Sequence, residues 1–159
     1  MTCDASRSLS RLLEAARETR DPTVLGEHLV NGLRETLPQT SWAGIYWLRG
    51  ADLVLGPFSG PATEHTTIPV SRGICGRAVR EDDDQLVHDV REAEDYLACS
   101  ASVRSELVVL LRADGRIIGQ IDLDSEKVGG FDDNDHCVLR TIADSFAGLI
   151  DTDALVDAA

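Results

Sequence analysis

A thiol and a carboxylate stand seven positions apart, at Cys99 and Glu106, directly before the strongly apolar segment 107–111. The reactive form of cysteine is the thiolate, which needs a polar and partly open environment. A loop held by a rigid strand provides such an environment. We therefore predict that Cys99 lies in a polar loop and carries nucleophilic or redox chemistry, with Glu106 at the start of the following strand.

Further residues have types and spacing that complete a thiol site. Cys75 lies in segment 71–80, which reads as a glycine-bearing turn that enters a short helix, and backbone N–H groups at a helix start stabilise a thiolate. Asp122 and Asp124 are two apart in a predicted strand, so their side chains project from one face. With Glu106 from a neighbouring strand, three carboxylates could converge. Crowded carboxylates raise one another's pKa, so one can stay protonated near neutral pH.

An aromatic pair lies in an earlier strand. Trp42 and Tyr46 are four apart and share a strand face, where they could pack against a methyl group and a sulfur atom. Each of these residues also has a purely structural explanation. The two aromatics could be core packing, and Cys75 could be a small buried hydrophobe.

The remaining cysteines, Cys3 and Cys137, are expected to be structural, one at the terminus and one in the last helix. Asp122 and Asp124 could equally form a solvated strand face. The chain contains no C-x-x-C pair, so a zinc site has little support. Structural disulfides are rare in a reducing compartment, so we expect that the four cysteines form no disulfide framework.

Length and charge restrict the class of protein. The chain has 159 residues, enough for a single domain over 1–159, and a net charge of −13. An acidic surface repels phosphate backbones and anionic lipid, so we expect neither nucleic acid nor membrane as a partner. Residues 1–4 have no basic end, no apolar signal region follows, and no apolar run approaches the roughly 20 residues of a membrane span. We therefore expect a cytoplasmic protein.

Hydrophobic periodicity predicts helices at both ends and strands between them. Two N-terminal helices are expected over 6–37, with Asp21 as the N-cap of the second, and a C-terminal helix over 132–150. The sheet core is expected over 41–125, with strands at 41–48, 53–58, 66–70, 85–90, 105–111 and 116–125. Segment 91–102 reads as irregular, and the tail after Asp151 is expected to fray. This order predicts an α+β fold with a central antiparallel sheet of about six strands flanked by helices.

Several motifs, in this order, resemble the free methionine-(R)-sulfoxide reductases, which are single-domain GAF proteins. The motifs are 42–46, 53–58, 68–70, Arg72-Gly73-Ile74-Cys75-Gly76, 97–99 with Ser105-Glu106, and 119–125.

The resemblance implies a GAF-like fold, a homodimer and no cofactor. It implies reduction of free methionine (R)-sulfoxide with thioredoxin as the reductant. Residue by residue, Cys99 matches the catalytic cysteine and Cys75 a second redox cysteine. The family's substrate-pocket positions correspond to Trp42, Tyr46, Glu106, Asp122 and Asp124. The resemblance implies no metal.

One departure from the family pattern concerns His65, which stands where the family commonly has a third cysteine, ten positions before Cys75. His65 is most simply a surface residue. It could instead lower the pKa of a nearby thiol, or bind a metal with Cys75 and Cys99. Ser100 also replaces a common aspartate, and residues 95–98 differ from the family's usual sequence.

Two other functions remain open beside the enzyme. One is a non-catalytic GAF module that binds a small ligand in the same pocket, and the other is a thiol redox switch without a small-molecule substrate. Sulfoxide reduction itself needs a thiolate to attack sulfur, a proton for the departing oxygen and a second thiol. Cys99, the carboxylates and Cys75 supply these three requirements.

Overall fold

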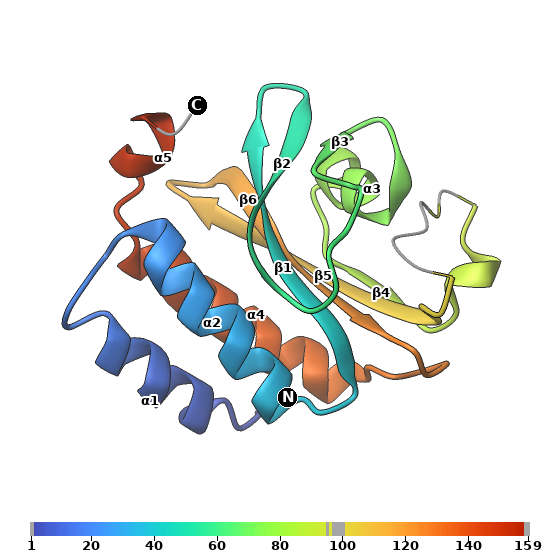
Figure 1. Ribbon diagram of the computed structural model, residues 1–159, viewed down its shortest axis with the longest axis horizontal. Helices are drawn as coiled ribbons and strands as arrows, with labels where there is room; N and C mark the ends of the chain where they lie inside the picture. Colours follow the sequence, from blue (N-terminus) through green and yellow to red (C-terminus); the bar gives the residue numbers. More distant parts are fainter. Residues whose placement is uncertain (1, 95, 97–100, 158–159) are drawn as a thin grey trace.

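The computed structural model describes residues 2–94, 96 and 101–157 and is built around one antiparallel sheet (Figure 1). Its strands are β1 (Thr40–Arg49), β2 (Asp52–Ser59), β3 (Thr67–Pro69), β4 (Gln85–Val87), β5 (Ser105–Ala113) and β6 (Arg116–Ser125). They pair in the order β3-β2-β1-β6-β5-β4. The predicted α+β class and six-stranded sheet are therefore confirmed.

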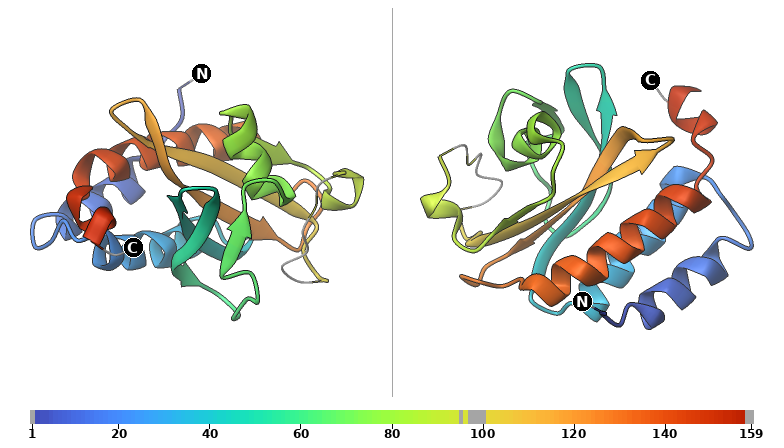
Figure 2. Two further views of the ribbon diagram at one scale, coloured as in Figure 1. Left: turned by 90° about the horizontal axis from the view of Figure 1, so that it is seen from above. Right: turned by 180° about the vertical axis from the view of Figure 1, so that it is seen from behind.

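Helices cover the two faces of the sheet unequally. The helices are α1 (Ser6–Ala15), α2 (Pro22–Thr36), α3 (Gly73–Glu81), α4 (Asp133–Leu149) and α5 (Asp153–Asp157), with a 3-10 turn η1 (Val90–Glu92). Figures 1 and 2 show α2 and α4 side by side on one face, with α1 outside them. The short α3 and its loops lie over the opposite face. We call these the helix face and the α3 face.

The helix face is an apolar core. Alternate residues of the central strands point toward α2 and α4, as the period-2 pattern predicts. Trp47 of β1 stacks on Phe146 of α4, with ring centroids 6.3 Å apart. The other strand residues buried here are Ala43, Ile45, Leu107, Val109, Leu111, Ile121 and Leu123.

Local sequence signals explain where the main helices begin. The carboxylate of Asp21 accepts hydrogen bonds from the backbone N–H groups of Thr23 and Val24, and Pro22 occupies the first turn of α2. Asp132 and Asp135 form a reciprocal capping box at the start of α4. The predicted N-cap at Asp21 is confirmed.

One expected segment end was wrong, and one strand is slightly longer than expected. The strand expected over 53–58 is β2, which runs to Ser59 with Gly56 and Pro57 opposite Ile45 in a bulge. The tail beyond Asp151 is not simply frayed. It forms α5, because Leu155 is buried in the helix-face core and the Asp151 N–H donates to the carbonyl of Arg20.

The expectation of no disulfide framework was also wrong. Cys3 and Cys137 form a disulfide with a Cα–Cα distance of 6.0 Å, which joins the N-terminal segment to α4. The expectation rested on the redox compartment. The fold, in contrast, brings together two cysteines 134 positions apart at a normal disulfide distance.

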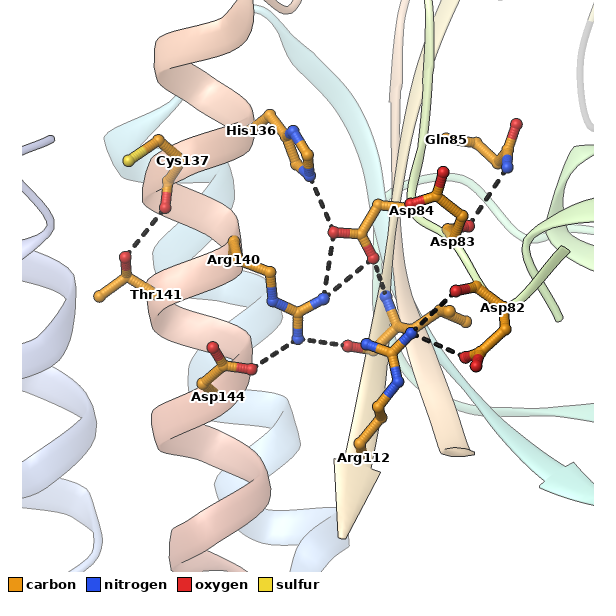
Figure 3. Close-up of polar contacts among 11 residues, drawn as sticks. Asp82, Asp83, Asp84, Gln85, Arg112, His136, Cys137, Arg140, Thr141 and Asp144 are labelled. Atoms are coloured by element: carbon orange, nitrogen blue, oxygen red, sulfur yellow. Dashed lines mark hydrogen bonds and ion pairs between the residues drawn. The ribbon is translucent and has the colours of Figure 1, made fainter. Parts of the chain in front are cut away.

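A partly buried carboxylate, that of Asp84, lies at the edge of β5 beyond the end of β4. Asp84 accepts a hydrogen bond from the backbone N–H of Leu110 at 2.9 Å, and Arg140 of α4 donates to both of its oxygens. His136 Nε2 lies 2.8 Å from the same carboxylate, and Arg140 also donates to the Leu110 carbonyl and to Asp144 (Figure 3). These contacts join α4, β5 and the loop after α3 at one edge of the sheet.

Within the described ranges, no helix has both the length and the apolar character needed to cross a membrane.

Candidate active site

Three carboxylates meet on the α3 face. Asp124 of β6 is the direct pairing partner of Glu106 of β5, and Asp122 lies two positions along β6 opposite Val108. Paired residues of an antiparallel sheet project from the same face. The exposed fractions are 5% for Glu106, 0% for Asp122 and 1% for Asp124. The strand spacing thus places the acids on one face as predicted, inside the protein and not on a solvated face.

Cys75 reaches the same cluster from the start of α3. Gly73 begins the helix with a φ of 71°, and a Cβ at Gly76 would lie 2.6 Å from the carbonyl oxygen of Val70. Glycine at these positions therefore lets the first turn of α3 press against the preceding segment. The Cys75 thiol donates to Glu106 Oε1 at 3.8 Å. Cys75 Sγ and one carboxylate oxygen each of Glu106 and Asp122 lie within 4.8 Å of one another.

The predicted aromatic pair flanks the acids. Trp42 pairs with Asp124 across β1 and β6, and its indole lies over Gly44, where a Cβ would overlap the ring. The Trp42 Nε1–H donates to the carbonyl of Pro61 at 3.1 Å. Gly44 is itself paired with Asp122, so the absence of a side chain there brings the indole beside the acids. Sequence reasoning missed Gly44, although a glycine inside an aromatic strand was the available signal.

Tyr46 lies deeper on the same face. It is fully buried, its ring centroid is 6.2 Å from that of Trp42, and its hydroxyl donates to the backbone carbonyl of His65 at 2.9 Å. His65, where the family commonly has its third cysteine, therefore lies beside the site through its backbone, with its side chain partly exposed. The metal site suggested for Cys75, Cys99 and His65 remains untested.

Burial governs the electrostatics of the cluster. Desolvation, followed by the charge of Asp124, raises the pKa of Glu106 to about 8, against smaller opposing effects of Asp122, Cys75 and Arg77. Desolvation and the neighbouring charge of Glu106 raise the pKa of Asp122 well above its ordinary value. Desolvation and the charge of Asp122 do the same for the pKa of Asp124. Glu106 is consequently protonated at pH 7, and burial shifts the pKa values of both aspartates in the same direction.

Several polar atoms of the cluster have no hydrogen-bond partner in the described part of the chain. They include both oxygens of Asp122 and Oδ2 of Asp124. Asp122 lies close to Glu106 and Cys75, and both neighbours affect its pKa. The amide of Gln120, two positions before Asp122 and fully buried, also has no partner at either atom. Sequence reasoning missed Gln120, although the period-2 pattern placed it on this face.

Of the predicted site residues, the structure brings together Cys75, Trp42, Tyr46, Glu106, Asp122 and Asp124. The predicted catalytic residue, Cys99, lies outside the described residues.

The GAF domain family matches residues 19–151. This chain belongs to the GAF family. It is 42% identical to free methionine-R-sulfoxide reductase of Escherichia coli K12 over 110 residues, which are 69% of this chain and 66% of that protein. The 39% identical protein YtsP of Bacillus subtilis aligns over 71% of this chain and 70% of its own length.

Solved structures agree with the assignment. Free methionine-R-sulfoxide reductase from Neisseria meningitidis, in complex with its substrate, superposes with a TM-score of 0.85 at 32% identity, over 100% of this GAF chain and 96% of that one. A putative GAF sensor protein from Burkholderia vietnamiensis superposes with a TM-score of 0.83 at 30% identity, over 96% and 99% of the two chains. The resemblance stated from the sequence is confirmed by these relatives.

Proposed function

We propose that this GAF protein reduces free methionine (R)-sulfoxide to methionine by thiol chemistry. The observation that supports this most directly is the convergence of Cys75, Glu106 and Asp122 within 4.8 Å on the α3 face. The relative from Neisseria meningitidis, solved with its substrate, aligns along the whole chain.

The cluster suits a small ligand with a positive charge. Buried carboxylates without a cation are costly, which is why their pKa values rise. In our proposal, the ammonium group of the amino acid binds at Asp122 and Asp124, whose unpaired oxygens accept its hydrogen bonds. Trp42 then packs against the methyl and sulfur end, for which aromatic rings are suited.

The reaction is proposed to begin at Cys99. Its thiolate attacks the sulfoxide sulfur, and the sulfoxide oxygen ends on Cys99 as a sulfenic acid while methionine leaves. The electrons therefore come from Cys99, and the proton needed by the oxygen comes from Glu106, whose raised pKa of about 8 keeps it protonated at pH 7.

Cys75 is proposed to regenerate the thiol. Its sulfur condenses with the Cys99 sulfenic acid, forming a disulfide and releasing water. A dithiol protein of the thioredoxin class then reduces this disulfide by exchange and becomes oxidised itself. From the family resemblance we also propose a homodimer located in the cytoplasm.

The decisive experiment follows NADPH consumption with thioredoxin, its reductase and free methionine (R)-sulfoxide. We expect turnover that Cys99→Ser abolishes and that Asp122→Asn lowers by at least about 100-fold, as for the loss of one charge-stabilising group. The (S)-sulfoxide serves as the substrate control and Asp82→Asn, an exposed acid, as the matched protein control. No turnover above the Cys99→Ser background would reject the proposal.

A non-catalytic ligand-binding module is the second candidate, favoured by His65 in place of the third cysteine and by the similarity to a putative GAF sensor protein. Intact mass after treatment with the sulfoxide separates the two functions. The enzyme loses two hydrogens in a step that requires Cys75, whereas a binding module keeps its mass and shows saturable binding only.

A further inference from the structure

The thiol of Cys75 and two carboxylates form a compact donor set inside the protein. Cys75 Sγ is 3.8 Å from Glu106 Oε1, and an oxygen of Asp122 completes a triangle with no side longer than 4.8 Å. In a tetrahedral zinc site, bond lengths of about 2.3 Å to sulfur and about 2.0 Å to oxygen place neighbouring ligand atoms about 3.5 Å apart. The Cys75–Glu106 separation is already close to this value.

Some oxygen atoms of this set are also free to bind a cation. Both oxygens of Asp122 lack a hydrogen-bond partner among the described residues, although the side chain is fully buried. Asp124, on the same face, has an unpaired Oδ2 as well. A buried carboxylate normally has hydrogen-bond partners. A cation bound among these ligand atoms would explain why the oxygens of Asp122 have none in the described part of the chain.

The geometry points to a binding site for a thiophilic divalent cation, of the class of Zn²⁺ and Cd²⁺, formed by Cys75, Glu106 and Asp122. Three protein ligands leave a fourth position for water or for Asp124. The thiolate excludes Mg²⁺ and Ca²⁺, which take oxygen ligands only, while borderline and soft cations accept sulfur with carboxylate. Binding releases the protons of the Cys75 thiol and the Glu106 carboxyl group to solvent, and it places a 2+ charge among acids that have no cation of their own.

Such a cation would occupy the place that we assign to the substrate's ammonium group, so the two would exclude each other. This consequence, unlike the site itself, rests on the proposed function. Free zinc or cadmium would therefore inhibit the enzyme. The bound cation would also prevent Cys75 from forming a disulfide.

The test titrates Cd²⁺ into the reduced chain and follows the near-ultraviolet absorption of the cadmium–thiolate bond. A Cys3→Ser/Cys137→Ser background leaves Cys75 and Cys99 as the only thiols. We expect one equivalent to bind, the absorption to disappear in Cys75→Ala, and the affinity to fall at least tenfold in Asp122→Asn. Cys99→Ser and Asp82→Asn, the two controls, should retain binding. Absorption that persists in Cys75→Ala, or that requires Cys99 instead, overturns the inference.

A second measurement on the unsubstituted chain keeps the inference falsifiable if the site variants fail to fold. Alkylation of Cys75, located by peptide mass, should be slowed by Cd²⁺ and not by Mg²⁺. An alkylation rate unaffected by Cd²⁺ overturns the site.

In the coupled assay, Cd²⁺ should raise the apparent KM for the sulfoxide. Cadmium binding without any sulfoxide turnover would reject the proposed function and leave the cation site standing. Turnover in a chain that binds no cadmium would do the reverse.

Discussion

Asp84 and Asp122 are both carboxylates enclosed beside β5, but their surroundings differ completely. Asp84 accepts a backbone hydrogen bond from Leu110, is paired with Arg140 and lies 2.8 Å from His136 Nε2 (Figure 3). Asp122 has no such partner for either oxygen, and its charged neighbour is another acid, Glu106.

Their pKa values move in opposite directions for this reason. Burial acts to raise the pKa of Asp84, but hydrogen bonds from His136 and Leu110 and the charge of Arg140 outweigh it and lower the pKa. For Asp122, burial and the neighbouring charge act together, and the pKa rises. The fold therefore stabilises the anion of Asp84. It disfavours the anion of Asp122, which a positively charged ligand bound beside it would stabilise.

The contrast extends to the two faces of the sheet. The helix face buries hydrocarbon such as Leu123 and Phe146 and is fastened to the N-terminal segment through Cys137. The α3 face buries Glu106 and Asp122 among apolar residues. Buried acids without a cationic partner lower the stability of the fold. We therefore interpret the α3 face as the functional face of the sheet.

The largest effect that tests this contrast is the dependence of stability on pH. Glu106 has a folded pKa of about 8 against an ordinary 4.5, so the folded state binds more protons between these values and the free energy of unfolding falls as pH rises. At about 1.4 kcal/mol per pKa unit, Glu106 accounts for a loss of about 5 kcal/mol from pH 4.5 to above pH 8. Urea unfolding at intervals across this range measures it.

The matched variant for this experiment is Glu106→Gln, which removes this titrating group and should make the fall in stability with pH smaller, leaving the part due to Asp122 and Asp124. Asp84 has a lowered pKa, so its stabilisation is present above its ordinary value and is lost only as the pH falls below about 4. Asp84→Asn should consequently keep the slope between pH 5 and 8. Stability that stays constant or rises with pH in this window would refute the assignment of Glu106.

Asp84→Asn should lower the free energy of unfolding by about 3 kcal/mol at pH 7, because Arg140 loses the more enclosed of its two carboxylate partners and keeps only the exposed Asp144. Asp82→Asn provides the control, since its salt bridge with Arg112 is exposed and worth at most about 1 kcal/mol. Denaturant midpoints at unchanged m-value measure both. If the two variants lose equal stability, Asp84 is not the structural anion described above.

The Cys3–Cys137 disulfide lies on the helix face, so it should affect stability and leave catalysis alone. We expect Cys3→Ser to lower the free energy of unfolding of the oxidised chain by about 2 kcal/mol. Calorimetry with and without reductant measures this, and the difference should be absent in the variant. A kcat/KM that falls by more than twofold in Cys3→Ser would show that the disulfide reaches the site.

Most of the fold could be predicted because its signals are local. Asp21 with Pro22 marks the start of α2, and the alternation in the strands assigns each side chain to a face. The features that escaped prediction depend on distant pairs. Cys3 and Cys137 are 134 positions apart, and Asp84 meets Arg140 across 56 positions. Nothing local to these residues indicates their partner.

The sequence predicted which of the acids share a face of the sheet, but not that this face is buried. The spacing of Asp122 and Asp124 fixed a shared face, and the register of β5 and β6 then placed Glu106 directly opposite Asp124. Whether that face was solvated depended on α3, which closes over it through Gly73 and Gly76. Gln120 went unnoticed because a single glutamine in a strand carries no chemical signal until its neighbours are known.

The smallest effect is the one that separates the two acids most directly. Near pH 8, Asp122→Asn should raise the free energy of unfolding by about 1 kcal/mol, because folding of the variant no longer has to protonate or bury that acid. The amide keeps the size of the side chain but donates hydrogen bonds, which offsets part of the gain. The same substitution at Asp84 is expected to destabilise, and urea midpoints of the two variants in one buffer compare them. Destabilisation of Asp122→Asn by as much as Asp84→Asn would mean that Asp122 has a partner that stabilises its anion, and the case for a site awaiting a cationic ligand would be lost.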